Sequence, residues 1–335
     1  KPAASLDDQK AFLAAAAEAG LAGIPVAEEY GGAGLTLAHE KIWREVKGNY
    51  PMPDNEFIIS HGMCMPMLAE YGTHEQKERF LEPLAQGKKL GLPAGFDVLK
   101  GELTGKTACK KHLLEFLGNG QAEGTRVVQY GRLAMRPGLP LFTFIGRLTP
   151  QKGVDLLISA FETLMDEDPG FQLLVLGSGT PELETRLEAV TISEGSAGRV
   201  CFLRGYDQEL ALKVYAAGDF FLIPSLYEPC GLTDYFAQLF GNLPVVHHVG
   251  GLLKVVDGET GFAYRKHSPA AMAETVRRVL EVFRNDQPRI LRMQQQAVRR
   301  IHGQHTWQQV MARYLELYER ALETVGGAAA GGGAL

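Results

Sequence analysis

The sequence contains few cysteines, and no two of them stand close together in the sequence. Its four cysteines are scattered along the chain, at Cys64, Cys109, Cys201 and Cys230. A disulfide framework or a structural zinc site needs cysteines at characteristic short spacings, so neither is expected here. Unpaired cysteines are typical of a reducing compartment, and a cytoplasmic location is therefore the expectation.

Basic tracts and long apolar runs are also missing. The net charge is -5 and no basic tract offsets it, which gives no support for a nucleic-acid partner. No apolar run reaches the length of a membrane span, and the first residues lack the charged-then-apolar plan of a signal peptide. No membrane partner is therefore expected, and the sequence indicates no particular oligomeric state.

What is present suits a globular protein with two different halves. The chain has 335 residues, of which 45% are hydrophobic, enough for two domains with a sizeable core. Apolar residues in 1–91 recur at helical spacing and nowhere alternate with period two, which predicts a small all-helical domain. Residues 92–139 are rich in glycine around one expected helix at 107–116, and this segment is predicted to be a linker.

Beyond residue 140 short apolar runs alternate with amphipathic segments of helical length. This rhythm predicts an α/β fold for 140–325, a Rossmann-like doubly wound parallel sheet covered by helices on both faces. Residues 326–335 are a Gly/Ala tail, expected to be disordered. The expected strands are 141–145, 171–176, 199–203, 220–223 and 244–247, and the expected helices are 154–165, 182–190, 209–217, 232–240, 270–283, 289–302 and 307–324.

The loops that follow these strands are the expected place for a ligand, because a doubly wound sheet binds ligands at the carboxyl ends of its strands. The first loop, 146–153, carries Arg147 and Lys152 just before a helix. Two cations beside the N-terminus of a helix are suited to binding a diphosphate. Taken alone, a solvated loop with two surface charges explains them equally well. A later loop presents Tyr206, which suits either stacking on a base or ordinary packing.

The most informative loop is 224–233, in which Pro229 and Gly231 hold the carboxylate Glu228 between the end of a strand and the start of a helix. A carboxylate at this position is able to accept hydrogen bonds from sugar hydroxyls, although an ordinary helix cap is the plainer reading. Cys230 has no histidine partner in an identifiable motif, so it is not expected to be a nucleophile. The glycine pair Gly250 and Gly251 follows the next strand.

Together these motifs closely resemble bacterial glycogen synthase and plant starch synthase, from about residue 105 to residue 325. The motifs that carry the resemblance are Arg147-Leu-Thr-Pro-Gln-Lys152-Gly, Gly205-Tyr206, Pro224-Ser225-x-x-Glu228-Pro-Cys-Gly-Leu-Thr233 and Gly250-Gly251-Leu252. The resemblance implies the GT-B fold and retaining transfer of glucose from ADP-glucose to an α-1,4-glucan. The implied partners are therefore a nucleotide sugar and an α-glucan, with no cofactor or metal required; whether the donor is ADP-glucose or UDP-glucose stays open.

The same resemblance assigns roles to individual residues. Arg147 and Lys152 neutralise the diphosphate, Glu228 binds glucose hydroxyls and Tyr206 packs on adenine. The other residues implied to bind the donor are Gly146, Gln151, Cys230, Gly231, Thr233, Gly250 and Gly251. Two positions depart from the family pattern: Phe236 stands where a second glutamate is common, and Leu253-Lys254 replaces the usual Ala-Asp pair, leaving Lys254 peripheral to the phosphates.

The first ninety residues resemble a different family, the helical N-terminal domain of acyl-CoA dehydrogenases. The resemblance is carried by Gly23-Ile24-Pro25-Val26-x-Glu28-Glu29-Tyr30-Gly31-Gly32 and by Tyr71-Gly72-Thr73-x-Glu75-Gln76. The Lys-x-Gly-Gly-Leu loop that begins a complete glycogen synthase is not in this sequence, so the chain is expected to hold the donor half and to be inactive alone. Two alternatives stay open, a fragment of a flavin-dependent acyl-CoA dehydrogenase and a non-catalytic nucleotide-binding protein. A gene fusion and a misassembled reading frame would both join the two families.

Overall fold

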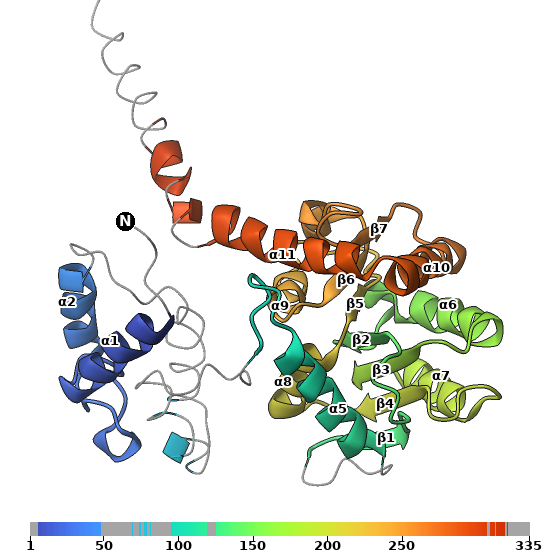
Figure 1. The fold of residues 1–335 in the computed structure, drawn as a ribbon, viewed down its shortest axis with the longest axis horizontal. Coiled ribbons are helices and arrows are strands. Elements are labelled where there is room, and N and C mark those ends of the chain that lie inside the picture. Colours follow the sequence, from blue (N-terminus) through green and yellow to red (C-terminus); the bar gives the residue numbers. More distant parts are fainter. Residues whose placement is uncertain are drawn as a thin grey trace, which may run out of the picture. The chain divides into compact units, whose positions relative to one another are not determined.

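A computed structural model describes residues 6–47, 95–118 and 125–306, and also residues 69, 74, 77, 78, 81, 309–311, 313–318 and 320. The chain divides into two compact units, Lys1–Leu92 and Pro93–Leu335 (Figure 1). Residues 48–91 of the predicted helical domain lie mostly outside the described residues, and the predicted tail at 326–335 lies entirely outside them.

The described part of the first unit is helical, as predicted. It contains α1 (Leu6–Glu18), a 3-10 turn η1 (Glu28–Tyr30) and α2 (Leu37–Lys47). Ala16, Ala22, Val26 and Leu81 form its small apolar cluster. The backbone N–H of Thr36, just before α2, donates to His39 Nδ1 at 3.3 Å, so this histidine caps the start of its own helix.

The second unit is built on one seven-stranded sheet with the order β1-β4-β3-β2-β5-β6-β7. Every neighbouring pair is parallel except β1 with β4, which is antiparallel. This confirms the predicted Rossmann-like doubly wound fold. The strands are β1 (Val128–Gly131), β2 (Leu141–Ile145), β3 (Gln172–Gly177), β4 (Val200–Arg204), β5 (Phe220–Ile223), β6 (Leu243–His247) and β7 (Phe262–Tyr264).

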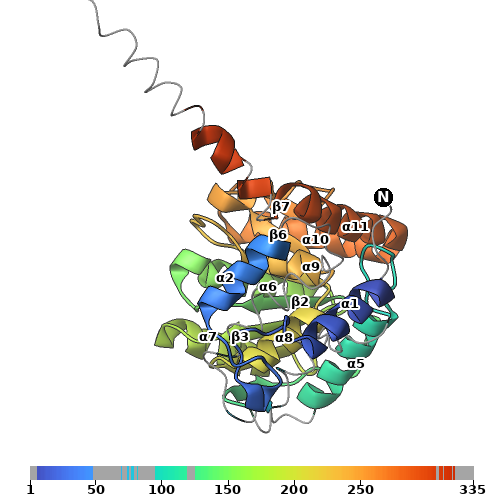
Figure 2. The ribbon, with the colours of Figure 1, turned by 90° about the vertical axis from the view of Figure 1, so that its left-hand side faces the viewer.

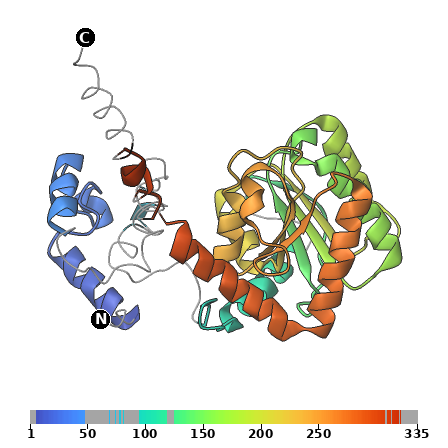
Figure 3. The ribbon, with the colours of Figure 1, turned by 90° about the horizontal axis from the view of Figure 1, so that it is seen from above.

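Helices cover both faces of the sheet in three layers. Helices α6 (Val154–Glu167), α7 (Pro181–Ile192) and α10 (Pro269–Asn285) pack on one face. Helices α5 (Thr104–Gly118), α8 (Gln208–Ala217) and α9 (Thr233–Leu239) pack on the other, as Figures 1 and 2 show. Helix α11 (Gln287–Gln304) follows α10 after a sharp bend, visible in Figure 3. Asp286 makes that bend, because it ends α10 and its carboxylate caps α11 through the N–H of Arg289.

A cluster of aromatic rings fills the first of these interfaces. Phe142 on β2 lies 5.1 Å from the ring of Phe220 on β5, 5.7 Å from Phe161 on α6 and 5.8 Å from Phe171. All four rings are fully buried. Burial of each ring contributes about 2 to 3 kcal/mol, and paired rings add about 1 kcal/mol. This cluster fixes β2 beside β5, the two strands whose following loops carry the site.

The segment predicted to be a linker belongs to the second unit. Helix α5 occupies 104–118, in place of the shorter helix expected at 107–116, and packs against α8. Strand β1 adds an antiparallel edge strand beside β4. Glycine-rich composition suggested a linker, but buried leucines of α5 and the register of β1 hold this segment on the sheet.

Two lysines of α5 anchor this segment. Lys106 is buried and donates to the carbonyl oxygen of Phe240 at 2.8 Å and to that of Ala216 at 3.3 Å, near the ends of α9 and α8. Lys110 Nζ lies 2.5 Å from Asp219 Oδ2. Burial lowers the pKa of Lys106 to about 8, with Asp219 opposing the shift.

The buried lysine predicts an unusual dependence of stability on pH. Between about pH 8 and pH 10.5, the unfolded chain binds the Lys106 proton and the folded chain does not. Raising the pH through this range therefore favours folding. The unfolding free energy of the native chain is expected to rise across this range relative to that of Lys106→Met, measured by urea titration. A difference that stays flat or falls with pH would show that the lysine is not buried as described.

Candidate functional site

The candidate site lies where the direction of strand addition reverses. From β2 the chain builds outward through β3 and β4, and it then crosses to β5 on the other side of β2. A crevice at the carboxyl ends of the strands is expected at such a switch point. The loops after β2, β5 and β6 meet there, and they contain most of the residues that the sequence singled out.

Backbone contacts join the β2 and β5 loops closely. The β2 loop forms a short 3-10 turn, η4 (Pro150–Lys152), before α6 begins. The N–H of Leu226 donates to the carbonyl oxygen of Gln151 at 2.9 Å, and the side-chain amide of Gln151 donates to the carbonyl oxygen of Tyr227. At Gly153, a Cβ atom would lie 2.0 Å from the carbonyl oxygen of Pro224, so only glycine permits this approach.

The chemical centre of the site is an ion pair between these loops. Lys152 Nζ lies 2.6 Å from Glu228 Oε2, and Ser225 Oγ donates to the same oxygen at 3.1 Å. Glu228 is 8% exposed. Its other oxygen, Oε1, accepts no hydrogen bond from any residue that the structure describes. Two donors therefore fix the orientation of the carboxylate and leave one oxygen to accept a bond from a ligand hydroxyl.

Arg147 differs from Lys152 in its surroundings. It lies in the same loop but is exposed, and it forms no ion pair within the described parts of the chain. Its five N–H donors are therefore available to a planar or tetrahedral anion. Lys152, in contrast, already has a carboxylate partner, so one lysine orients Glu228 and the neighbouring arginine remains free.

The glycine pair after β6 brings a third loop against the β5 loop. Gly250 and Gly251 begin the 3-10 turn η5 (Gly250–Lys254), and the N–H of Gly251 donates to the carbonyl oxygen of Glu228 at 2.7 Å. A Cβ atom on Gly251 would lie 2.1 Å from the carbonyl oxygen of Cys230. The two glycines thus set the shape of the Cys230–Gly231 turn through direct backbone contact.

Two histidines contact the backbone of the β5 loop, and no sequence motif predicted this role. His247 Nδ1 lies 2.8 Å from the carbonyl oxygen of Ser225, and His267 Nε2 lies 2.9 Å from that of Pro224. The rings of His247 and His267 are 4.8 Å apart. Both therefore position the backbone that carries Ser225 and Glu228.

A second ion pair lies next to the Cys230–Gly231 turn. Lys254 Nζ is 3.2 Å from Oδ1 of Asp234, a fully buried carboxylate. Burial raises the pKa of Asp234 to about 7, and the ammonium of Lys254 opposes that shift. The sequence predicted that Lys254 is peripheral to the phosphates. In the structure its ammonium is bonded to the Cys230–Gly231 turn. Neither partner alone predicted the pair, because they are twenty positions apart, Asp234 in the first turn of α9 and Lys254 at the end of η5.

Some predicted residues lie apart from this centre. Tyr206 follows β4, two strands from β2, and its side chain is 61% exposed. Arg147 and Gly146 follow β2, and neither forms a hydrogen bond or ion pair with Glu228 in the described structure. Thr233 begins α9, and its hydroxyl makes no hydrogen bond with the described residues. The structure thus brings together Gln151, Lys152, Glu228, Cys230, Gly231, Gly250 and Gly251.

The described residues contain neither a membrane-spanning helix nor a cluster of metal-ligand side chains. No helix among the described residues is long and apolar enough to cross a membrane. Within the same residues, no three side chains of His, Cys, Asp or Glu are grouped as metal ligands would be.

Both halves of the chain match known protein families. Residues 139–282 match the family described as glycosyl transferases group 1. Residues 2–88 match the family described as acyl-CoA dehydrogenase, N-terminal domain. Both resemblances drawn from the sequence motifs are therefore confirmed.

Individual proteins that resemble the second unit are glycogen and starch synthases. A glycogen synthase of Anaeromyxobacter sp. (strain Fw109-5) is 40% identical over 202 residues, which cover 58% of this chain and 38% of the relative. A glycogen synthase of Syntrophotalea carbinolica is 36% identical over 66% of this chain and 43% of the relative. The catalytic domain of starch synthase IV from Arabidopsis thaliana, solved with ADP and acarbose, has a TM-score of 0.55 and 26% identity, covering 75% of this chain and 53% of that one. The chain thus spans less than half the length of these two curated relatives.

Proposed function

Because residues 139–282 match the group 1 glycosyl transferases, we propose that the second unit is the donor-binding half of a hexosyltransferase of the glycogen/starch synthase type. The donor in this proposal is ADP-glucose, and the reaction is retaining transfer of glucose to an α-1,4-glucan. The observation that carries the proposal is the carboxylate of Glu228, held by Lys152 and Ser225 at the switch point with one oxygen unoccupied by the described residues.

The roles of the residues follow from their positions. Glu228 Oε1 accepts a hydrogen bond from a glucose hydroxyl, since its other oxygen is already fixed. Arg147 binds the diphosphate and stabilises the negative charge that develops on the leaving group. Lys152, beside it in the same loop, contributes positive potential and holds Glu228 in place. The adenine side of the site is assigned to Tyr206, whose exposed ring is suited to stacking.

Protein cations take the place of a metal in this proposal, since Arg147 and Lys152 both lie in the loop after β2. The free thiols of Cys109, Cys201 and Cys230 support a reducing compartment, and we place the protein in the cytoplasm.

The acceptor site is assigned to the other domain of a GT-B enzyme, whose motif loop this sequence lacks. The chain is therefore expected to bind ADP-glucose without extending a glucan. Incorporation of radiolabelled glucose from ADP-glucose into glycogen tests this, with a complete glycogen synthase as the positive control. Background incorporation by the chain is the expected result, and robust elongation by the chain alone would contradict it.

The match of residues 2–88 to acyl-CoA dehydrogenases supports a second candidate, a flavin-dependent fragment. The two candidates differ in a visible property, because a bound flavin has an absorption band near the blue end of the spectrum. A colourless purified protein supports the transferase proposal. A yellow protein that releases flavin on denaturation would favour the second candidate.

A further inference from the structure

The ammonium of Lys254 is bound by the backbone of the Cys230–Gly231 turn and by a buried carboxylate. Its ammonium donates to the carbonyl oxygen of Cys230 at 2.8 Å and to that of Gly231, and it lies 3.2 Å from Asp234 Oδ1. Two of its three N–H donors are therefore used by carbonyl oxygens of the turn, and the contact with Asp234 is an ion pair without a hydrogen bond. The side chain is only 17% exposed. The ammonium of Lys254 thus faces protein oxygens, although it lies three residues after the glycine pair.

The direction of these bonds determines what the turn presents on its other side. In a trans peptide unit the C=O and the N–H point in opposite directions. Because the carbonyl oxygens of Cys230 and Gly231 point to Lys254, the N–H groups of Gly231 and Leu232 point away from it. No oxygen atom of the described residues accepts a hydrogen bond from either N–H.

The backbone of this turn has the conformation of an anion-binding nest. Gly231 is left-handed, with φ of 66°, and Leu232 is right-handed, with φ of -88° and ψ of -24°. Successive residues of opposite hand direct their N–H groups into one concavity that suits an anion. The turn borders Glu228, since a Cβ atom on Gly231 would lie 3.4 Å from Glu228 Cγ.

We propose that Lys254 is a positioning residue of the donor site, which holds the Cys230–Gly231 turn by its carbonyl oxygens so that the turn's N–H groups face the donor diphosphate. This inference rests on the proposed function. The diphosphate is bound by the turn, and Lys254 acts through the turn without touching the ligand.

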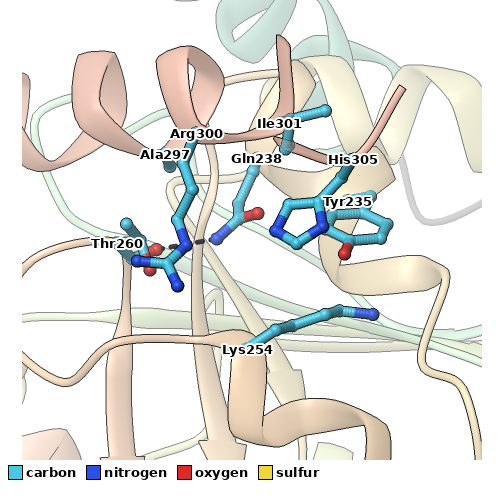
Figure 4. Close-up of a pocket in the computed structure, with 8 residues that line it drawn as sticks. All are labelled: Tyr235, Gln238, Lys254, Thr260, Ala297, Arg300, Ile301 and His305. Carbon is cyan, nitrogen blue, oxygen red and sulfur yellow. Dashed lines mark hydrogen bonds between the residues drawn. The ribbon is translucent and has the colours of Figure 1, made fainter. Parts of the chain in front are cut away.

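The surroundings explain why a lysine is stable at this position. Asp234 supplies a buried counter-charge, and the ring of Tyr235 lies 3.9 Å from the ammonium. Figure 4 shows Lys254 along one wall of a small pocket, below Tyr235, with Arg300 and His305 of the α11 segment on the opposite side. Burial and the cations Arg300, Lys254 and Arg313 lower the pKa of His305. The charged side chains that line the pocket are thus cations, with no carboxylate among them. Asp234 is therefore the carboxylate that balances the charge of Lys254.

The experiment distinguishes two roles of Lys254: neutralising the buried charge of Asp234, and holding the Cys230–Gly231 turn in place. Lys254→Met is expected to weaken ADP binding about tenfold, the loss expected when the displaced turn forfeits one N–H hydrogen bond to the charged diphosphate, and to lower the melting temperature. Adding Asp234→Asn removes the unpaired buried charge, so the double variant is expected to regain melting temperature but not ADP affinity. Lys111→Met removes one charge from an exposed position of α5 and serves as the control, with native affinity expected.

Calorimetry with ADP and ligand-observed NMR with adenosine provide the readouts. Adenosine binding is expected to be the same in the native chain and all three variants, because adenosine has no phosphate to reach the turn. If the double variant regains both stability and ADP affinity, Lys254 only neutralises Asp234 and the inference is overturned. If the native chain itself fails to bind ADP, the proposed function is overturned and the inference with it.

Discussion

Replacing Lys152 by Met is expected to weaken ADP binding by about 10- to 100-fold, because a hydrogen bond to a charged group contributes roughly 1.5 to 3 kcal/mol. The substitution removes a cation from the β2 loop and one of the two donors that orient Glu228. It also leaves a carboxylate that is 8% exposed without its partner, so the unfolding free energy is expected to fall as well. Calorimetry and urea unfolding measure the two effects.

A double-mutant cycle with Glu228→Gln tests whether the two residues act as a pair. Each single variant leaves one partly buried charge alone, whereas the double variant leaves none. The double variant is therefore expected to be less destabilised than the sum of the single variants, by about 1 kcal/mol or more. Arg147→Met is the matched comparison, since Arg147 is exposed: it is expected to weaken ADP binding without lowering stability. Additive losses in the cycle would contradict the ion pair.

Replacing Gly251 by Ala is expected to abolish measurable ADP binding. The new Cβ atom would lie 2.1 Å from the carbonyl oxygen of Cys230 and 2.3 Å from its carbonyl carbon. Both atoms belong to the backbone, so no side-chain rotation relieves the contact, and the Cys230–Gly231 turn must move. Overpacking of this kind costs about 1 to 3 kcal/mol or more, which a lower melting temperature would register.

Gly303→Ala is the matched control for that variant. Nothing lies within 4 Å of the Cβ position at Gly303, which is inside α11. Alanine is favoured over glycine inside a helix by about 1 kcal/mol, so this variant is expected to be slightly more stable and to bind ADP normally. Native ADP affinity in Gly251→Ala would show that the contact between the β5 and β6 loops does not shape the site.

The sequence predicted the centre of the second unit well, for a physical reason. Strands buried on both faces are continuous apolar runs, so 141–145 and 220–223 could be located to the residue. Edge strands carry a weaker signal. Strand β1 lies among glycines and is partly exposed, and β7 has only three residues, so neither was predicted. Helix α5 was located, but the bonds of its lysines to carbonyl oxygens and Asp219 were not predicted, because their partners lie about a hundred residues away in sequence.

The site was predicted in part. Lys152 and Glu228 were identified because each follows a strand beside a helix start, and parallel topology brings such loops together. Ser225, His247 and Lys254 were not assigned their contacts. Their roles depend on which carbonyl oxygens face them across two or three loops, and residue spacing along the chain does not encode that geometry.

Titration of the native chain with ADP in a calorimeter tests the central claim most directly, that the loops after β2, β5 and β6 form a nucleotide-sugar donor site. Saturable binding at one site is the expected result, weakened in Lys152→Met and unchanged in Lys111→Met. The absence of saturable binding by the native, folded chain would contradict the claim.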